Sequence, residues 1–207
     1  MASPSPAPPL RACLLSGGAS RRMGRDKALL PHPAGGTWLE HTLRQLAVLE
    51  VPISLLSRHP EHRTRARELA LAQLDCLDEP PPWEGPLLAL QRLMAHHPEQ
   101  RLLLCPVDLP HLKAPVLLQL QALATAEPAA LHLAHDGERL QPLLGVYPSD
   151  LARRTSLSAA VDAGERRLQS WLAGQPCRIH RLDPLALRNI NRPEDLPPWP
   201  TNPNGSA

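Results

Sequence analysis

The chain is poor in aromatic residues. Its 207 residues include no Phe, one Tyr and four Trp, so aromatic residues make up 2% of the sequence. A buried core must therefore be built mainly from Leu, Ala and Val. Proteins that hold single-stranded nucleic acid by base stacking need several aromatic rings. A formal net charge of +2 is also too small to neutralise many phosphates. The composition argues against a nucleic-acid-binding function.

Cysteine is scarce as well. The four cysteines are far apart and form no Cys-x-x-Cys pair, which gives no sign of a disulfide framework or a zinc site. The N-terminal stretch has neither a charged start nor an apolar segment, so it does not resemble a signal peptide. No apolar run approaches the length of a membrane span. These absences predict a cytoplasmic protein with no membrane segment.

Strand and helix patterns alternate along most of the chain. Pro-rich tails at residues 1–9 and 197–207 are predicted to be disordered, and residues 10–196 to form a single domain. Apolar runs predict strands at Ala12–Ser16, Val51–Leu56, Leu74–Leu77, Arg101–Val107, Leu131–His135, Leu140–Tyr147 and Arg178–Leu182. Helices are expected after Thr37 and near 61–72, 87–94, 149–163 and 165–172. This order predicts an α/β fold: a three-layer αβα, Rossmann-like domain with a mostly parallel sheet.

The first predicted strand leads into a glycine-rich segment, Leu14–Lys27, that contains Gly17, Gly18 and Gly24. Glycines let the chain turn sharply and bring backbone N–H groups close to phosphate oxygens. The spacing matches neither the Walker P-loop nor the Rossmann dinucleotide fingerprint. Lys27 is one of only two lysines in the chain. Its presence in this segment indicates that a compact positive charge is required there. We interpret the segment as a cradle for a nucleoside triphosphate. A glycine-rich turn with surface arginines is the alternative.

A carboxylate follows the fourth predicted strand, in the segment Cys105–Pro110. Asp108 is flanked by Pro106 and Pro110, and a stiff loop positions an oxygen ligand well. Mg²⁺ is usually held by one or two carboxylates together with substrate phosphates. Since ligands bind beyond the carboxyl ends of parallel strands, we expect Asp108 to lie near the glycine-rich loop. Taken alone, Asp108 could equally be a turn or helix-cap residue.

Six segments in the same order resemble the MobA-like nucleotidyltransferases over about residues 10 to 196. They are Leu15–Lys27, Gly85–Leu87, Cys105–Pro110, His135–Arg139 together with Gln141–Leu143, Ala163–Arg167 and Asn189–Leu196. The resemblance implies transfer of GMP from GTP to the phosphate of molybdopterin, with release of diphosphate. It further implies Mg²⁺ as cofactor, and molybdenum-insertion and molybdoenzyme delivery proteins as partners.

The resemblance also implies roles for individual residues. Nucleotide binding falls to Leu15, Ser16, Gly17, Gly18, Lys27, Asp78 and Asp108. Arg22 and Lys27 would stabilise the leaving diphosphate, and Asp108 would bind the metal. The candidates for contact with the pterin are His135, Asp136, Arg139, Arg166, Arg167, Asn189 and Asn191. Read without the family pattern, Asp136-Gly137 is a turn, the two arginines are a solvated helix face and the asparagines are helix caps.

Three departures from the family pattern concern base recognition. Ser16 stands where the family usually has Ala, Leu55–Arg58 lacks the Asn that often contacts the nucleoside, and Leu88-Ala89 replaces a further Gly. The related cytidylyltransferases are the nearest alternative, but they favour Ala-Gly after the strand and a Gly-Asp-Gln-Pro type metal loop. A non-catalytic nucleotide-binding protein of the same fold is a second alternative, against which Lys27 and Asp108 speak.

Overall fold

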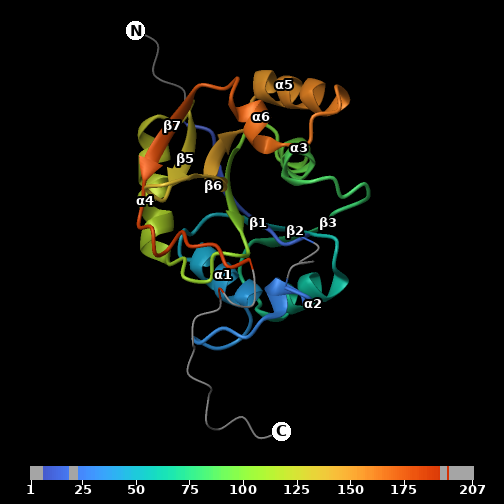
Figure 1. Cartoon of the computed structure of the whole chain (residues 1–207), viewed down its shortest axis with the longest axis vertical. Coiled ribbons are helices and arrows are strands. Elements are labelled where there is room, and N and C mark those ends of the chain that lie inside the picture. The colour runs from blue at the N-terminus through green and yellow to red at the C-terminus, as the bar shows by residue number, and fades with distance from the viewer. Residues whose placement is uncertain (1–6, 19–22, 192–194, 196–207) are drawn as a thin grey trace, which may run out of the picture.

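The centre of the molecule is a seven-stranded sheet in the order β3-β2-β1-β4-β6-β5-β7 (Figure 1). The computed structural model describes residues 7–18, 23–191 and 195. The strands are β1 (Leu10–Leu15), β2 (Ile53–Ser57), β3 (Leu74–Asp78), β4 (Arg101–Pro106), β5 (Leu131–His135), β6 (Leu140–Pro148) and β7 (Cys177–Arg181). Strand β6 runs antiparallel to β4 and β5, and the other pairings are parallel. The expected mostly parallel sheet is confirmed.

Helices cover both faces of this sheet (Figure 1). Helices α1 (Trp38–Ala47), α2 (Pro60–Glu68) and α4 (Ala114–Ala126) pack on one face. Helices α3 (Pro86–His96), α5 (Leu151–Asp162) and α6 (Leu168–Leu172) pack on the other. The three-layer αβα architecture is therefore confirmed.

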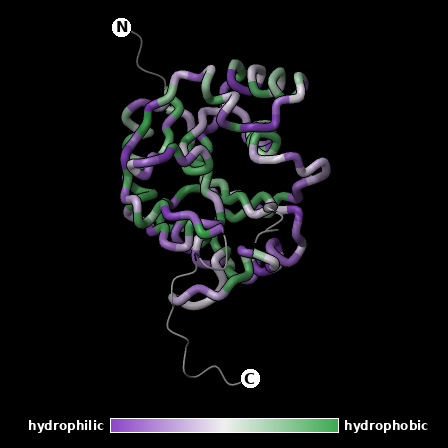
Figure 2. The backbone as a smooth tube through the Cα atoms, in the orientation of Figure 1, coloured by the Kyte–Doolittle hydropathy of each residue, from purple (hydrophilic) through white to green (hydrophobic). Residues whose placement is uncertain are grey.

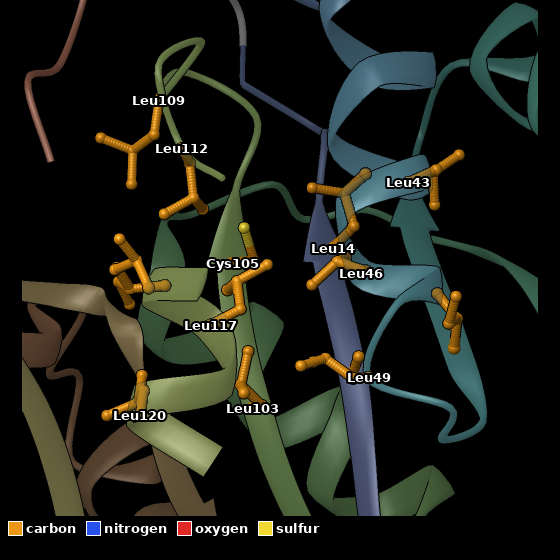
Figure 3. Packing of buried hydrophobic residues seen from close by; sticks show 14 of the residues in the cluster. Leu14, Leu43, Leu46, Leu49, Leu103, Cys105, Leu109, Leu112, Leu117 and Leu120 are labelled. Carbon is orange, nitrogen blue, oxygen red and sulfur yellow. The ribbon is translucent and has the colours of Figure 1, made fainter. Parts of the chain in front are cut away.

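The core is divided by the sheet into two clusters, because successive side chains of a strand point to opposite faces. In β1, Ala12 and Leu14 pack in the cluster under α1, whereas Cys13 packs in the cluster under α3. Leucines of α1 and α4 fill the first cluster around β1 and β4, as Figure 3 shows. Figure 2 shows the hydrophobic segments concentrated in the central strands. Leucine side chains therefore occupy the core volume that Phe side chains occupy in many other proteins.

One helix, α4, was not expected from the sequence. Its residues Ala114–Ala126 are apolar at most positions, so no 3.6-residue alternation of apolar and polar side chains marks it. Helix α1 does begin as expected, because Thr37 and Glu40 form a reciprocal capping box. Helix α6 starts later than expected, at Leu168, because the Glu165 carboxylate accepts hydrogen bonds from the backbone N–H groups of Arg166 and Arg167.

The predicted tails fall mostly outside the described residues, as 1–6 and 197–207 do. Residues Pro8 and Pro9 are described, and their carbonyls accept hydrogen bonds from the Arg101 side chain and backbone. Within the described part of the chain, no helix is both long enough and apolar enough to cross a membrane.

The strand order creates a crevice at one edge of the sheet. From β1 the chain passes to β2 on one side, whereas β4 pairs with β1 on the other side. Ligands of open α/β sheets bind at such a reversal of strand order, beyond the carboxyl ends of the strands. Gly17 follows β1 and Asp108 follows β4, so both lie at this point.

Candidate active site

A cavity of about 420 Å³ opens beyond the carboxyl ends of β1 and β4. Its wall combines the end of β1 and the following glycines, the Asp26-Lys27 pair, the loop after β4 and the start of α3. The sequence-predicted residues that line it are Leu15, Ser16, Gly17, Gly18, Lys27 and Asp108. The structure therefore brings together residues more than 80 positions apart in the chain, as the strand order requires.

Gly17 is closely packed against an acidic side chain. A Cβ at this position would lie 2.2 Å from Oε2 of Glu79, so no larger residue fits unless that carboxylate moves. A Cβ on Gly18 would meet nothing within 4 Å, and Gly18 faces the open cavity. Bare backbone thus borders the cavity at both positions, which suits the close approach of phosphate oxygens.

Lys27 and Asp108 face one another in this cavity. The Lys27 ammonium donates to Oδ2 of Asp108 at 3.3 Å and to Oδ1 of Asn191 at 2.7 Å. The side chains of Lys27 and Asp108 are 12% and 24% exposed, so both are largely shielded but still reach the cavity. The Asn191 segment is held in place because the Ile190 N–H donates to the Asp108 carbonyl at 3.1 Å.

Asp108 fits one kind of metal site. Among the described residues, no group of three or more His, Cys, Asp or Glu side chains is arranged to hold a metal ion. The protein itself therefore offers no complete coordination shell in that part of the chain. A single partly exposed carboxylate beside a phosphate-sized cavity suits Mg²⁺ or a similar hard cation, which takes most of its ligands from phosphates and water.

Asp26 is held firmly in the cavity wall. Its Oδ1 accepts from the backbone N–H of Ala28 at 3.0 Å and caps the short helix η1 (Lys27–Leu29). Its Oδ2 lies 2.9 Å from Nε2 of the buried His62. Burial by itself would raise the pKa of Asp26, but the hydrogen bonds and charge of His62 and the Ala28 N–H outweigh it and lower that pKa. Asp26 is therefore ionised at neutral pH.

The far wall of the cavity also carries Arg58 and Trp83, two residues that were not predicted to belong to the site. The Arg58 guanidinium lies 4.9 Å from the centre of the Trp83 ring, and both residues line the cavity. The Trp83 indole N–H donates to the Glu79 carbonyl at 2.8 Å. Glu79 pairs with Arg92 at 3.2 Å. Burial raises the pKa of Glu79, against the opposing charges of Arg92 and Arg58.

Two of the residues predicted to bind the nucleotide, Asp78 and Arg22, are not among the described residues that line the cavity. Asp78 does not line the cavity; its exposed carboxylate accepts from Arg63 at 2.8 Å. The next residue, Glu79, faces the cavity instead. Arg22 lies outside the described residues. Asp78 as a nucleotide ligand and Arg22 as a diphosphate ligand stay predictions.

None of the predicted pterin residues is among the described residues that line the cavity. Asp136 serves the turn between β5 and β6, where it accepts from the Glu138 and Arg139 N–H groups and from Gln141. This confirms the expected turn. His135, at the carboxyl end of β5, accepts from the Gly137 N–H at 2.9 Å. Since β5 is parallel to β4, this turn lies at the same edge of the sheet as the cavity.

The other predicted pterin residues divide into two places. Arg166 pairs with Glu84 and donates to the Val161 carbonyl, beside the start of α3. Arg167 is the N-cap of α6. Asn189 is exposed, and Asn191 contacts Lys27 rather than open solvent alone. Contact of any of them with a pterin stays a prediction.

The chain is similar to known proteins in sequence and in fold. Residues 12–181 match the family model of the MobA-like NTP transferase domain. A probable molybdenum cofactor guanylyltransferase of Rhodopirellula baltica is 36% identical over 199 residues, which is 92% of each chain. The solved molybdopterin-guanine dinucleotide biosynthesis protein A of Archaeoglobus fulgidus superposes with a TM-score of 0.69 at 17% identity, covering 89% of this chain and 94% of that one.

A further solved structure of the same fold was determined with a metal present. A protein of Mycobacterium tuberculosis, determined as a complex with manganese, superposes with a TM-score of 0.61 at 18% identity, covering 86% of this chain and 90% of that one. At this identity the likeness concerns the fold alone.

Proposed function

The chain belongs to the MobA-like NTP transferase family, and from this premise we propose that it transfers GMP from GTP to the phosphate of molybdopterin. The products are molybdopterin guanine dinucleotide and diphosphate. The observation that carries the proposal is the pairing of Lys27 with Asp108 in the wall of a cavity that is also lined by Gly17 and Gly18. Molybdenum-insertion and delivery proteins stay predicted partners.

Different residues of the cavity have different roles in nucleotidyl transfer. Such transfer needs in-line positioning and neutralisation of negative charge, with little covalent work by the protein. The backbone at Gly17 and Gly18 receives the triphosphate, and the Lys27 ammonium stabilises the departing diphosphate. Arg22 is proposed to assist Lys27. No general base is required, because the attacking group is already an ionised phosphate oxygen.

Asp108 would hold the divalent cation, and we propose Mg²⁺. Asp108 would offer that cation one carboxylate ligand, and the cation would supply neutralisation of phosphate charge and polarisation of the α-phosphorus. Before GTP arrives, Lys27 compensates the charge of Asp108. The Lys27 ammonium thus holds the Asp108 carboxylate at the cavity, where it would serve as a ligand of the cation.

The test of the reaction is a product assay with GTP, CTP and molybdopterin in the presence of Mg²⁺. We expect diphosphate release and dinucleotide formation with GTP and little of either with CTP. Preferential use of CTP would make the chain a cytidylyltransferase. Binding of GTP without any diphosphate release in the presence of molybdopterin would make it a non-catalytic nucleotide-binding protein.

The test of the site uses Lys27→Ala and Asp108→Ala. Each variant should keep the fold, measured by circular dichroism and thermal unfolding, and lose at least about a hundredfold in turnover, in line with the loss of one preorganised charge at a reacting group. The matched control is Lys113→Ala, since Lys113 is the other lysine and lies at the N-cap of α4. Full activity in Asp108→Ala would remove the metal assignment.

A further inference from the structure

A buried histidine connects the two ends of the glycine-rich segment. His62, on α2, is 1% exposed and is not part of the cavity wall described above. Its Nδ1 lies 2.9 Å from the Ser16 carbonyl and 3.0 Å from the hydroxyls of Ser16 and Ser57. Its Nε2 lies 2.9 Å from Oδ2 of Asp26. One ring therefore contacts the residue before Gly17 and the residue before Lys27.

The direction of one of these hydrogen bonds is settled by chemistry. The lowered pKa of Asp26 leaves its carboxylate ionised, so that oxygen can only accept and His62 Nε2 must be the donor. The Ser57 hydroxyl donates to the Ser16 carbonyl at 2.8 Å and reinforces the same junction. A ring that is buried and hydrogen-bonded at both nitrogens has a fixed orientation.

The contact with Asp26 sets the position of Lys27. The second oxygen of that carboxylate caps η1 at Ala28, so fixing Asp26 also fixes the backbone from which the Lys27 side chain extends. From there the ammonium reaches Asp108 and Asn191. A chain of contacts thus runs from α2 to the charge that is proposed to meet the diphosphate.

We propose that His62 is a positioning residue for nucleotide transfer, acting through Asp26 on Lys27 without touching the substrate. The inference rests on the proposed role of Lys27 in GTP binding. It predicts that the free protein already holds Lys27 opposite Asp108, so that little ordering is needed when GTP binds. A side chain that only filled space in the core would not need these polar contacts.

The experiment compares two substitutions of His62 whose side chains differ in length. In His62→Asn the amide occupies the place of Nδ1, keeping the Ser16 side and losing the contact with Asp26. In His62→Gln the longer side chain can still donate to Asp26. We expect the Kd of Mg·GTP, measured by calorimetry, to rise at least about fivefold in the Asn variant and less than twofold in the Gln variant.

A second readout follows the segment itself. Hydrogen exchange of the peptide from Met23 to Leu30 should be faster in His62→Asn than in the parent protein, because the cap at Ala28 loosens. The matched control is His97→Asn. His97 is also a buried histidine bonded to a serine of β2, Ser54 at 3.0 Å, but it does not line the cavity. This variant should bind GTP as the parent does.

A double-mutant cycle separates this inference from the proposed function. If His62 acts through Lys27, His62→Asn should add no further loss of GTP affinity in a Lys27→Met background. Equal additional loss in both backgrounds would overturn the positioning role, and so would normal GTP binding by His62→Asn beside weak binding by Lys27→Met. Normal GTP binding by Lys27→Met would instead contradict the proposed function.

Discussion

At the scale of single residues, the far wall of the cavity offers a flat surface for a base. Trp83 is 51% exposed although its ring is fixed by a hydrogen bond to the Glu79 carbonyl and by Arg58. Exposed aromatic rings beside a phosphate cradle suit base stacking, which contributes about 1 to 3 kcal/mol per base. With the triphosphate at the glycine end, as proposed above, guanine is predicted to lie against Trp83.

Trp83→Ala should therefore weaken GTP binding about tenfold, in proportion to the lost stacking energy. The measurement is a calorimetric titration with Mg·GTP. Inorganic triphosphate carries no base and should bind the variant and the parent equally. Equal weakening of both ligands would place Trp83 on the phosphate side and contradict this assignment.

The two glycines after β1 should respond differently to a methyl group. Gly17→Ala should lower the thermal unfolding temperature, with a cost on the order of 1 kcal/mol, because its Cβ must push Glu79 away from Gly17. Gly18→Ala has open space around its Cβ and should unfold as the parent does. Both are measured without ligand, so that effects on phosphate binding do not enter. Equal unfolding temperatures would show that Glu79 adjusts freely.

At the scale of elements, the antiparallel strand β6 is closely packed against β5 at Gly145. Its pairing with β5 is irregular between Leu133 and Ala134, and Gly145 is paired with Leu133. A Cβ on Gly145 would lie 2.5 Å from the His132 carbonyl oxygen and 2.8 Å from a Leu133 methyl. Neither the strand backbone nor the buried leucine can move away easily.

Gly145→Ala should accordingly lower the free energy of unfolding by about 1 to 3 kcal/mol, the usual cost of overpacking. Urea denaturation gives this value. Gly174→Ala is the control, since the nearest atom to its Cβ, the Trp171 carbonyl oxygen, is at an ordinary 3.7 Å. An unchanged midpoint for Gly145→Ala would mean that the β5–β6 pair can widen.

At the scale of the whole molecule, several histidines are held in their neutral form. Burial, together with neighbouring positive groups, lowers the pKa of His41 and of His97 from 6.5 to about 4. Burial also lowers the pKa values of further histidines, namely His32, His59, His111 and His180. In the unfolded chain these rings regain an ordinary pKa of about 6.5.

The stability should therefore fall as the pH falls from about 6.5 toward 4. In that window the unfolded chain binds more protons than the folded one, so the free energy of unfolding rises with pH and levels off above it. Urea denaturation at about pH 7.5 and pH 5 measures the difference. His97→Asn should show a smaller difference than the parent, because one such ring is gone. Equal stability at both pH values in the parent would contradict the prediction.

The sequence was sufficient where the deciding signal was local. The apolar runs and the Thr37–Glu40 capping box each act over a few residues, and the strands and helix α1 formed near their expected positions. The expectation that Gly17 and Asp108 meet at one edge also needed only a general rule, because ligands bind beyond the carboxyl ends of parallel strands. The full strand order came from the structure. Helix α4 lacked such a signal because its apolar positions do not alternate with polar ones.

What the sequence determined by itself was the family pattern and the pair of chain segments that carry Lys27 and Asp108. Only the tertiary structure decided which neighbours complete the site. Asp78 and Glu79 are adjacent acids, and their side chains leave the end of β3 in different directions, so one meets Arg63 and the other the cavity. His62, Arg58 and Trp83 reach the site through the packing of α2 and the loop after β3. Such contacts between distant segments depend on how the layers fit together, which no local pattern encodes.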